Sequence, residues 1–515
     1  MLFNSHIFIF AFLPLTLLLF YAAARRSAYL ALSVLVLASL IFYAWDSPLE
    51  HFVVLVASIS MNFVFGRAII QAYESQRPAR RRVLLAAGIA ANLCVLGFYK
   101  YTGFLFNTIG IPSPFADIYL PLGISFFTFT QIAYLVDASC GRAKEYSPIH
   151  YVLFVTYFPH LIAGPILHHR EMMPQFANRR IFTFRAENLS IGLSIFVIGL
   201  AKKLLLADPV APLADAAFNA TANGIALTIA EAWLGALAYA MQIYFDFSAY
   251  SDMAIGISRI FGIRLPVNFA SPYKAASIVE FWRRWHMTLS RFLRDYLYIP
   301  LGGNRHGLTR RYLNLIITML LGGLWHGAAW TFVIWGGLHG IYLCINHAWS
   351  HFGAKFGYAL PRALSVCITF IAVVIAWVFF RAESAMHANA MLHAMLGLNG
   401  ISLPTTVLRI LGEHVGDGPV AQLLGLQFDG MFHNGIYEYP GELLTGIGVL
   451  LAIVWFLPNT AQLFARYRPA LMPWRDAATK LVWRPTLAWS VYGAVLFVAA
   501  IFAISQDSPF LYFRF

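Results

Sequence analysis

The sequence predicts an all-α polytopic membrane protein. Of its 515 residues, 60% are hydrophobic and only 11% are charged, and the mean hydropathy is +0.67. Soluble domains carry about 25% charged residues. Many apolar stretches exceed the roughly 18 residues that mark a spanning helix. The basic residues lie between these stretches, so the formal charge of +13 indicates a positive-inside bias rather than a nucleic-acid partner.

The first apolar stretch covers residues 7–24. Residues 1–6 contain no lysine or arginine, whereas Arg25 and Arg26 follow the stretch directly. A signal peptide carries its positive residues in front of its apolar core. We therefore expect a retained first helix whose amino end lies outside the cytoplasm.

About twelve spans are expected, with both ends of the chain outside the cytoplasm. They lie near residues 7–24, 28–45, 51–72, 83–100, 118–136, 188–206, 226–246, 313–330, 331–347, 364–380, 443–457 and 486–504. Charge supports this orientation near the carboxyl end. Residues 382–442 contain one basic and six acidic residues, whereas residues 459–486 contain five basic and one acidic. The first of these segments is therefore predicted to be external and the second cytoplasmic.

Two segments are unsuited to simple spans. Tyr151–Leu167 is apolar but is interrupted by Pro159, Gly164 and Pro165, and residues 263–312 mix aromatic residues with many cationic ones. Irregular backbone at membrane depth is tolerated only where it is buried in protein or lines a wet cavity. We therefore expect both segments to be re-entrant or interfacial elements around a central site.

The four cysteines are widely spaced and form no Cys-x-x-Cys pair. Three of them, Cys94, Cys344 and Cys367, lie in apolar stretches. This pattern predicts buried small hydrophobic residues rather than a disulfide or a metal site.

His326 stands in the stretch Gly322-Gly323-Leu324-Trp325-His326-Gly327-Ala328, and residues 312–347 around it are almost free of charge. An ionisable side chain at membrane depth is costly and suggests function. The flanking glycines allow backbone or substrate to come close. The alternative is a neutral histidine bonded to a neighbouring helix.

A cationic aromatic segment covers residues 277–305. At helical spacing, its apolar residues Phe281, Trp285 and Leu289 fall on one face. Four arginines of this segment are candidate ligands of an anionic donor: Arg283, Arg284, Arg291 and Arg294. The segment is either an interfacial helix facing anionic lipid or the electropositive cytoplasmic mouth of a site for a phosphate-rich donor.

Four blocks of the sequence resemble the membrane-bound O-acyltransferase superfamily. They are Tyr157-Phe158-Pro159-His160-Leu161-Ile162-Ala163-Gly164-Pro165, Tyr244-Phe245-Asp246-Phe247-Ser248-Ala249-Tyr250-Ser251-Asp252-Met253-Ala254-Ile255-Gly256, Glu280-Phe281-Trp282-Arg283-Arg284-Trp285-His286 and Leu324-Trp325-His326-Gly327. The resemblance is strongest to the membrane subunit of alginate O-acetylation. It is more distant to the membrane component of teichoic-acid D-alanylation.

The resemblance covers residues 1–385, which would form the acyltransferase core. Residues 386–442 would be an external loop region. Residues 443–515 would hold two further spans, a cytoplasmic basic loop and an external aromatic tail. The family implies a ring of tilted helices around a thin central catalytic partition, with a cytoplasmic funnel for the acyl donor and an opposite funnel for the acceptor. By motif position, His326 corresponds to the catalytic histidine and His286 to a second important histidine.

The chemistry of acetyl transfer fits this expectation. Acetyl-CoA carries several negative charges and cannot cross hydrocarbon, so only the acetyl group needs to pass. A histidine, whose ordinary pKa is about 6.5, can take a proton from a hydroxyl and give it to a leaving thiolate. We expect His326 to be this base, which is worth roughly 100- to 10,000-fold in rate. His286 would orient a reactant or stabilise an oxyanion, or else simply anchor its segment. No permanently bound cofactor or metal is expected.

The aromatic tail reads Pro509-Phe510-Leu511-Tyr512-Phe513-Arg514-Phe515. One interpretation is an aromatic belt at the outer membrane interface. The tail also resembles the carboxyl-terminal motif of a small partner in D-alanylation, whose tyrosine is thought to carry the acyl group. This resemblance implies that Tyr512 is an external acyl relay.

The remaining polar residues of the apolar core are weaker candidates for a functional role. His160, His339 and His347 could each line a funnel, but a packed or interfacial position is favoured. Asp246 and Asp252 could pair with the arginines of residues 283–294 or fix helix packing.

The predicted function is transfer of acetyl groups from a cytoplasmic donor across the bacterial inner membrane, for O-acetylation of an extracellular polysaccharide. Alginate is the first candidate polymer, and peptidoglycan and cellulose remain open. An external SGNH-type O-acetyltransferase would complete the transfer, because the chain has no Gly-x-Ser-x-Gly element. The alternative is a transporter or flippase of a polysaccharide or lipid precursor. A metalloprotease is disfavoured because His-Glu-x-x-His is absent.

Overall fold

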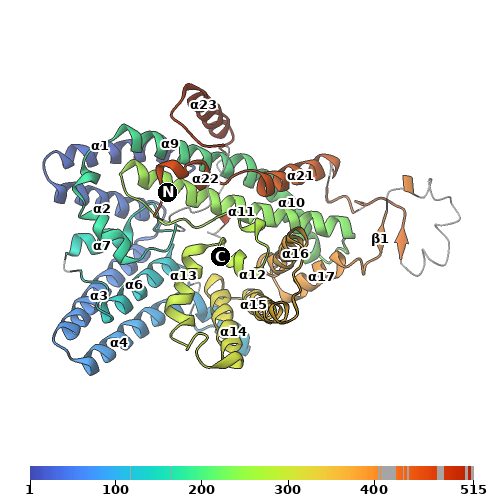
Figure 1. The fold of residues 1–515 in the computed structure, drawn as a ribbon, viewed down its shortest axis with the longest axis horizontal. Coiled ribbons are helices and arrows are strands. Elements are labelled where there is room, and N and C mark those ends of the chain that lie inside the picture. Colours follow the sequence, from blue (N-terminus) through green and yellow to red (C-terminus); the bar gives the residue numbers. More distant parts are fainter. Residues whose placement is uncertain are drawn as a thin grey trace.

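The computed structural model describes most of the chain. It covers residues 1–115, 118–145, 147–162, 164–403, 406–407, 425–432, 434–437, 440–471, 481–504 and 509–511. These residues are mostly helical, as the sequence predicts, and helices pack on helices throughout (Figure 1).

The helices follow in this order. The first half of the chain contains α1 (Leu13–Ala24), α2 (Ala28–Ala44), α3 (Leu49–Glu74), α4 (Pro78–Leu96), α5 (Thr102–Ile109), α6 (Ile124–Ser139), α7 (Pro148–Thr156), α8 (His169–Phe176), α9 (Ala186–Ala201), α10 (Ala211–Ala222) and α11 (Ile229–Ile260). The second half contains α12 (Ile278–Trp282), α13 (Met287–Leu293), α14 (Gly307–His326), α15 (Trp330–Phe356), α16 (Arg362–Arg381), α17 (Ala385–Met395), α21 (Pro440–Phe456), α22 (Thr460–Leu463) and α23 (Leu487–Phe502).

Shorter elements connect these helices. Tighter or wider helical turns form η1 (Phe8–Phe12), η2 (Gly97–Tyr101), η3 (Arg179–Phe182), η4 (Lys202–Ala207), η5 (Asp208–Val210), η6 (Pro272–Lys274), η7 (Arg294–Tyr298) and η8 (Ala465–Tyr467). Two short parallel strands, β1 (Ile401–Ser402) and β2 (Leu426–Gln427), pair beyond the helical body (Figure 1).

The central helix is α11, whose residues are almost all buried. It begins with a capping box in which Thr228 and Glu231 satisfy each other's backbone N–H groups. It packs against α9, α10 and α16. Glycines set the contact with α9, since a Cβ added at Gly192 would lie 2.6 Å from the carbonyl oxygen of Gly256.

Each segment predicted to span overlaps a helix, although α6 begins only at Ile124 within the predicted span 118–136. Within the described part of the chain, four helices are long and apolar enough to cross a membrane: Leu49–Glu74, Pro78–Ile109, Ala186–Ala222 and Arg362–Arg381. Shorter apolar helices cover Phe8–Ala24, Ala28–Ala44, Gly441–Phe456 and Leu487–Phe502. Two of the long helices run past the predicted ends at residues 100 and 206, because the wide turns η2 and η4 continue them without a break.

The outer surface of these helices is strongly apolar. Leu18, Val64 and Phe502 are among many large hydrophobic side chains that are more than half exposed. An apolar exterior of this extent is suited to contact with lipid. It also explains why Cys94 and Cys367 are exposed, although the sequence predicts buried cysteines, because the apolar stretches that hold them face outward.

The two irregular segments are buried in protein. After α7 the described residues 157–162 and 164–168 form no helix, and Phe158, Leu161 and Leu167 are buried. In the second segment, the continuous face expected for residues 277–305 is wrong. His286 has φ 40° and separates α12 from α13. Phe281, Trp285 and Leu289 are nevertheless all buried.

Candidate acyl-transfer site

His326 is the last residue of α14, where a helical hairpin turns into α15. Glycines bring the two helices together at this turn. A Cβ at Gly323 would collide with the carbonyl oxygen of Phe332, and a Cβ at Gly336 would collide with that of Met319. Gly323 and Gly336 therefore serve a close approach of backbone to backbone.

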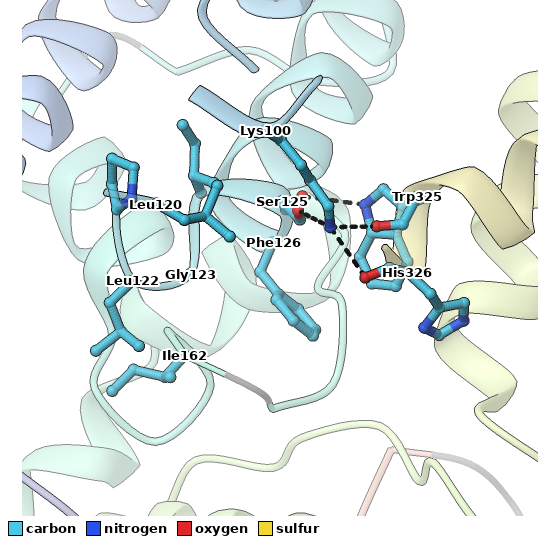
Figure 2. Close-up of a pocket in the computed structure, with 11 residues that line it drawn as sticks. Lys100, Leu120, Leu122, Gly123, Ser125, Phe126, Ile162, Trp325 and His326 are labelled. Atoms are coloured by element: carbon cyan, nitrogen blue, oxygen red, sulfur yellow. Dashed lines mark hydrogen bonds between the residues drawn. The ribbon is translucent and has the colours of Figure 1, made fainter. Parts of the chain in front are cut away.

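Lys100 binds the carboxyl end of α14. Its Nζ donates hydrogen bonds to the carbonyl oxygens of Trp325 (2.6 Å) and His326 (3.1 Å) and to Ser125 Oγ (3.1 Å). Next to it, the Tyr101 hydroxyl donates to the carbonyl oxygen of Leu324 at 2.8 Å. A cation at this end satisfies terminal carbonyl groups and the helix dipole. Figure 2 shows these carbonyl oxygens directed at Lys100, while the His326 imidazole extends away from it.

The His326 ring lies in an aromatic enclosure and is only 6% exposed. The rings of Trp335 and Phe380 meet it edge to face, with centroids 5.1 and 5.2 Å away. The His286 ring lies 6.4 Å from it, centroid to centroid. Folding thus brings together the two histidines that are 40 positions apart in the sequence.

His286 is fully buried, and its hydrogen-bond network fixes its tautomer. Its Nδ1 lies 3.2 Å from Asn268 Oδ1, which also accepts hydrogen bonds from the Thr288 backbone N–H (3.3 Å) and hydroxyl (2.8 Å). A backbone N–H can only donate, so this Asn268 atom is the oxygen and His286 Nδ1 carries the hydrogen.

His286 Nε2 therefore presents a lone pair. It has no hydrogen-bond partner among the residues that the structure describes. In this form the imidazole can accept a hydrogen bond or a proton, but it cannot donate to an oxyanion at Nε2.

Two cavities lie near the histidine pair, and His326 lines the smaller of them. The larger, about 940 Å³, is lined mainly by residues between Val279 and His347, including the cations Arg283, Arg291, Arg294 and Arg311 and the imidazole of His347. The smaller, about 110 Å³, is lined by Lys100, residues 120–126, Ile162, Trp325 and His326. Within the described residues, no side chain lines both cavities.

The four arginines predicted to bind a donor are not equivalent. Three of them line the larger cavity, but Arg284 does not and instead pairs with Glu280 at 2.6 Å. Arg291 forms a bidentate pair with Glu171, at 2.6 and 3.0 Å, and Arg294 pairs with Asp295 at 2.7 Å.

Asp246 and Asp252 bind lysines, so the predicted pairing with the arginines of residues 283–294 is wrong. Asp246 Oδ1 lies 2.7 Å from Lys203 Nζ, and Asp252 Oδ2 lies 2.8 Å from Lys202 Nζ. Both pairs join α11 to η4, so these aspartates fix helix packing, as the alternative interpretation holds.

Tyr512 lies outside the described residues, but the segment before it is anchored in the protein. The Leu511 N–H donates to Asp246 Oδ2 at 2.9 Å, and Lys203 Nζ donates to the Pro509 carbonyl oxygen at 3.1 Å. The next residue of α11, Phe247, meets the His286 ring edge to face at 4.8 Å. The segment of residues 509–511 is therefore attached to Asp246, and the next residue of α11, Phe247, contacts the candidate site.

The other histidines divide as follows. His160 is packed, with its Nε2 3.0 Å from the Phe154 carbonyl oxygen. His339 is buried among aromatic rings, including those of Trp282 and Trp335. His347 lines the larger cavity.

Sequence reasoning missed Lys100, Asn268 and Arg311. Lys100 could have been predicted as a functional residue, because it is a lone cation at the end of an apolar stretch. No sequence pattern points to Asn268, since its role depends on contacts that only folding creates.

Comparison with known proteins identifies the family. Residues 117–386 match the membrane-bound O-acyltransferase family, MBOAT. The chain belongs to the MBOAT family. It is therefore a membrane-bound O-acyltransferase, and the matched region holds both histidines and the cations of the larger cavity.

Several MBOAT relatives match the chain along its whole length. It is 41% identical to the peptidoglycan O-acetyltransferase of Helicobacter pylori, covering 100% of this chain and 98% of the relative. It is 39% identical to the probable alginate O-acetylase AlgI of Pseudomonas aeruginosa, covering 100% of both. The teichoic acid D-alanyltransferase of Bacillus subtilis is 28% identical over 52% of this chain and 70% of its own length.

Proposed function

We propose that this acyltransferase takes acetyl groups from a cytoplasmic thioester and passes them across the bacterial inner membrane, for O-acetylation of an extracellular polysaccharide. The observation that carries the proposal is the position of His286, whose ring centroid lies 6.4 Å from that of His326, near two cavities that share no described side chain. Relatives named for alginate and for peptidoglycan acetylation support both polymers as candidates. Alginate remains our first candidate, with peptidoglycan beside it.

Helix direction supports the sidedness of this proposal. Arginines stand near the start of both α4 and α14, and these helices end near Lys100 and His326, which contact each other. In this proposal the two helices run in the same direction, with their basic ends on one side. Because basic ends stay in the cytoplasm, we assign the larger cavity to the cytoplasmic side and the smaller to the outer side. This assignment is compatible with the expected ring of helices and two funnels.

The proposed reaction uses a neutral His326. An acceptor hydroxyl oxygen bonds to the acetyl carbonyl carbon while His326 takes the hydroxyl proton. The carbon–sulfur bond then breaks, and the same proton passes to the leaving thiolate. The products are an O-acetyl ester and a free thiol. The lone pair on His286 Nε2 supports the orienting role for this residue over the oxyanion role.

The donor in this proposal is acetyl-CoA, bound by its phosphates to Arg283, Arg291 and Arg294 in the larger cavity. Arg284 pairs with Glu280 outside that cavity, so it would attract the phosphates only by long-range electrostatics. The acceptor is Tyr512, whose acetyl ester would pass to an external SGNH-type O-acetyltransferase. The anchoring of residues 509–511 beside Asp246 supports an acceptor close to the site.

The test is mass spectrometry of the purified protein after incubation with isotopically labelled acetyl-CoA, beside His326→Ala and Tyr512→Phe. We expect label on Tyr512 in the wild type and none in either variant. Equal donor consumption by His326→Ala would overturn the assignment of the base. Normal polymer acetylation with Tyr512→Phe would overturn the relay alone. Movement of a polymer or lipid precursor without donor turnover would instead favour the flippase alternative.

A further inference from the structure

The larger cavity is lined by two arginines and a histidine that we call the distal cluster: Arg283, Arg311 and His347. Arg311 belongs to the second turn of α14 and His347 to the carboxyl-terminal half of α15. Arg311 contacts His347 directly, and Arg283 lines the same cavity.

The hydrogen bonds of the distal cluster leave donors free. An Nη atom of Arg311 lies 2.6 Å from His347 Nδ1. A guanidinium has no acceptor, so Nδ1 must accept, and a neutral His347 carries its hydrogen on Nε2. The Nε of Arg311 is buried and has no partner among the described residues. A bond between a cation and a neutral imidazole does not offset the positive charge.

Among the described residues, the arginines of the distal cluster are not paired with carboxylates as the other cations of the same cavity are. Arg291 and Arg294 are paired with the carboxylates of Glu171 and Asp295. Arg283 is exposed and has no ion pair in the part of the chain that the structure describes. Positive charge without a carboxylate, facing a cavity of about 940 Å³, is suited to bind an anion.

The position of the distal cluster along α14 indicates which anion. Arg311 stands fifteen residues before His326 in one helix, which corresponds to about 22 Å at roughly 1.5 Å per residue. Thr318 and Met319, between them in the sequence, line the same cavity. An extended donor could therefore lie along α14 with its thioester toward His326 and an anionic group at the distal cluster.

Resting on the function proposed above, we propose that the distal cluster binds a terminal phosphomonoester, the 3′-phosphate of the acyl-CoA donor. A phosphomonoester carries nearly two negative charges near neutral pH and three acceptor oxygens, which match several converging N–H donors. Acyl groups on a carrier protein are joined through a phosphodiester and lack this group. The distal cluster thus selects free acyl-CoA over a carrier-bound acyl group.

The experiment compares acetyl-CoA with acetyl-3′-dephospho-CoA as donors for the full-length protein in detergent. Wild type should lose about 10- to 100-fold in kcat/KM when the 3′-phosphate is absent, the range expected for hydrogen bonds to a charged group. Arg311→Gln should lose a similar factor with acetyl-CoA and little more with the dephospho donor. Equal use of the two donors by wild type, or the same loss with both donors in Arg311→Gln, would overturn the proposal.

The matched control is Arg310→Gln, which removes the same charge from the neighbouring, exposed residue of α14. Arg310 does not line the cavity, so this variant should discriminate the two donors as wild type does. If it lost discrimination equally, general charge rather than the distal cluster would be responsible.

A binding measurement separates this proposal from the proposed function. Calorimetry with adenosine 3′,5′-bisphosphate and adenosine 5′-monophosphate needs no turnover. Preference of wild type for the bisphosphate, lost in Arg311→Gln, would support the phosphate site even if no acetyl transfer were detected. Equal binding of both nucleotides would overturn it. Transfer from an acetylated carrier protein but not from acetyl-CoA would overturn the choice of donor.

Discussion

At the scale of single residues, the candidate site depends on one buried amide. Asn268 Oδ1 accepts hydrogen bonds from His286 and from two groups of Thr288. Its side-chain NH₂ lies 3.5 Å from Ser251 Oγ, and its backbone carbonyl accepts from the Met287 N–H at 3.0 Å. Asn268 therefore holds both the backbone break at His286 and the hydrogen on its Nδ1.

We predict that Asn268→Leu impairs both folding and transfer. The change leaves the Nδ1–H of His286 and the Thr288 donors without an acceptor, which should lower the free energy of unfolding by about 1–3 kcal/mol. A misplaced His286 should reduce kcat by up to about 100-fold. Thermal unfolding and acetyl-transfer rates in detergent measure the two effects. Asn107→Leu, at an exposed position in α5, is the control, and wild-type kcat in Asn268→Leu would contradict the positioning role.

The importance of His326 and His286 could be predicted from sequence, but their setting could not. A histidine in an apolar stretch is conspicuous because of its cost at membrane depth. The partners Lys100 and Asn268 come from other parts of the chain, 226 positions before His326 and 18 before His286. The pairing of Arg284 with Glu280 follows helical spacing, i to i+4, and could have been predicted.

At the scale of elements, the hairpin of α14 and α15 fixes where His326 stands. The two helices cross at Gly323 and Gly336, where no side chain separates the backbones. Gly337, one residue further along α15, has only the far end of Leu320 near its missing Cβ, at 3.4 Å. Neighbouring glycines in one helix thus have different structural roles.

We predict opposite results for alanine at these two positions. Gly336→Ala should destabilise the protein by about 1–3 kcal/mol, because its Cβ would meet the backbone of α14. Gly337→Ala should be neutral, or stabilising by up to about 1 kcal/mol, because alanine favours the helix. Thermal unfolding of both variants measures the two changes in stability. Equal stability of the two would contradict the close crossing.

Hydropathy predicts the helices well because burial in lipid selects long apolar stretches. It fails where irregular backbone is buried by the protein itself. The sequence of residues 277–305 has a helical pattern, yet His286 adopts a left-handed conformation that is unusual for a residue other than glycine. The contact of Asn268 with both His286 and Thr288 supports that conformation, and this contact is not visible in the local sequence.

At the scale of the whole molecule, described residues near both ends of the chain contact the central helix α11. Phe3 stacks on Tyr250 with ring centroids 4.8 Å apart, and Phe510 meets the same ring edge to face at 4.7 Å. Lys203 lies between two carboxylates, those of Asp246 and Asp208, each at 2.7 Å. The segment of residues 509–511 is attached to this buried ionic group.

We predict that Lys203→Met strongly destabilises the protein. It would leave Asp246 buried without its counter-charge, which typically costs about 3–5 kcal/mol. Lys144→Met, which breaks the exposed pair with Glu74, should change stability by only about 0–1 kcal/mol. Unfolding of both variants in the same detergent gives the comparison. A similar small loss in the two variants would show that the buried pair is not required.

The separation of the two cavities has a consequence for the cell as well as for the reaction. A bacterial inner membrane stores energy as an electrical potential and a proton gradient, and a continuous aqueous path through an acyltransferase would discharge both. Trp325 and His326 line the smaller cavity, and no described side chain lines both cavities. An acyltransferase whose two cavities are separated in this way offers ions no shared opening, so its abundance is not limited by the leak that an open channel would cause.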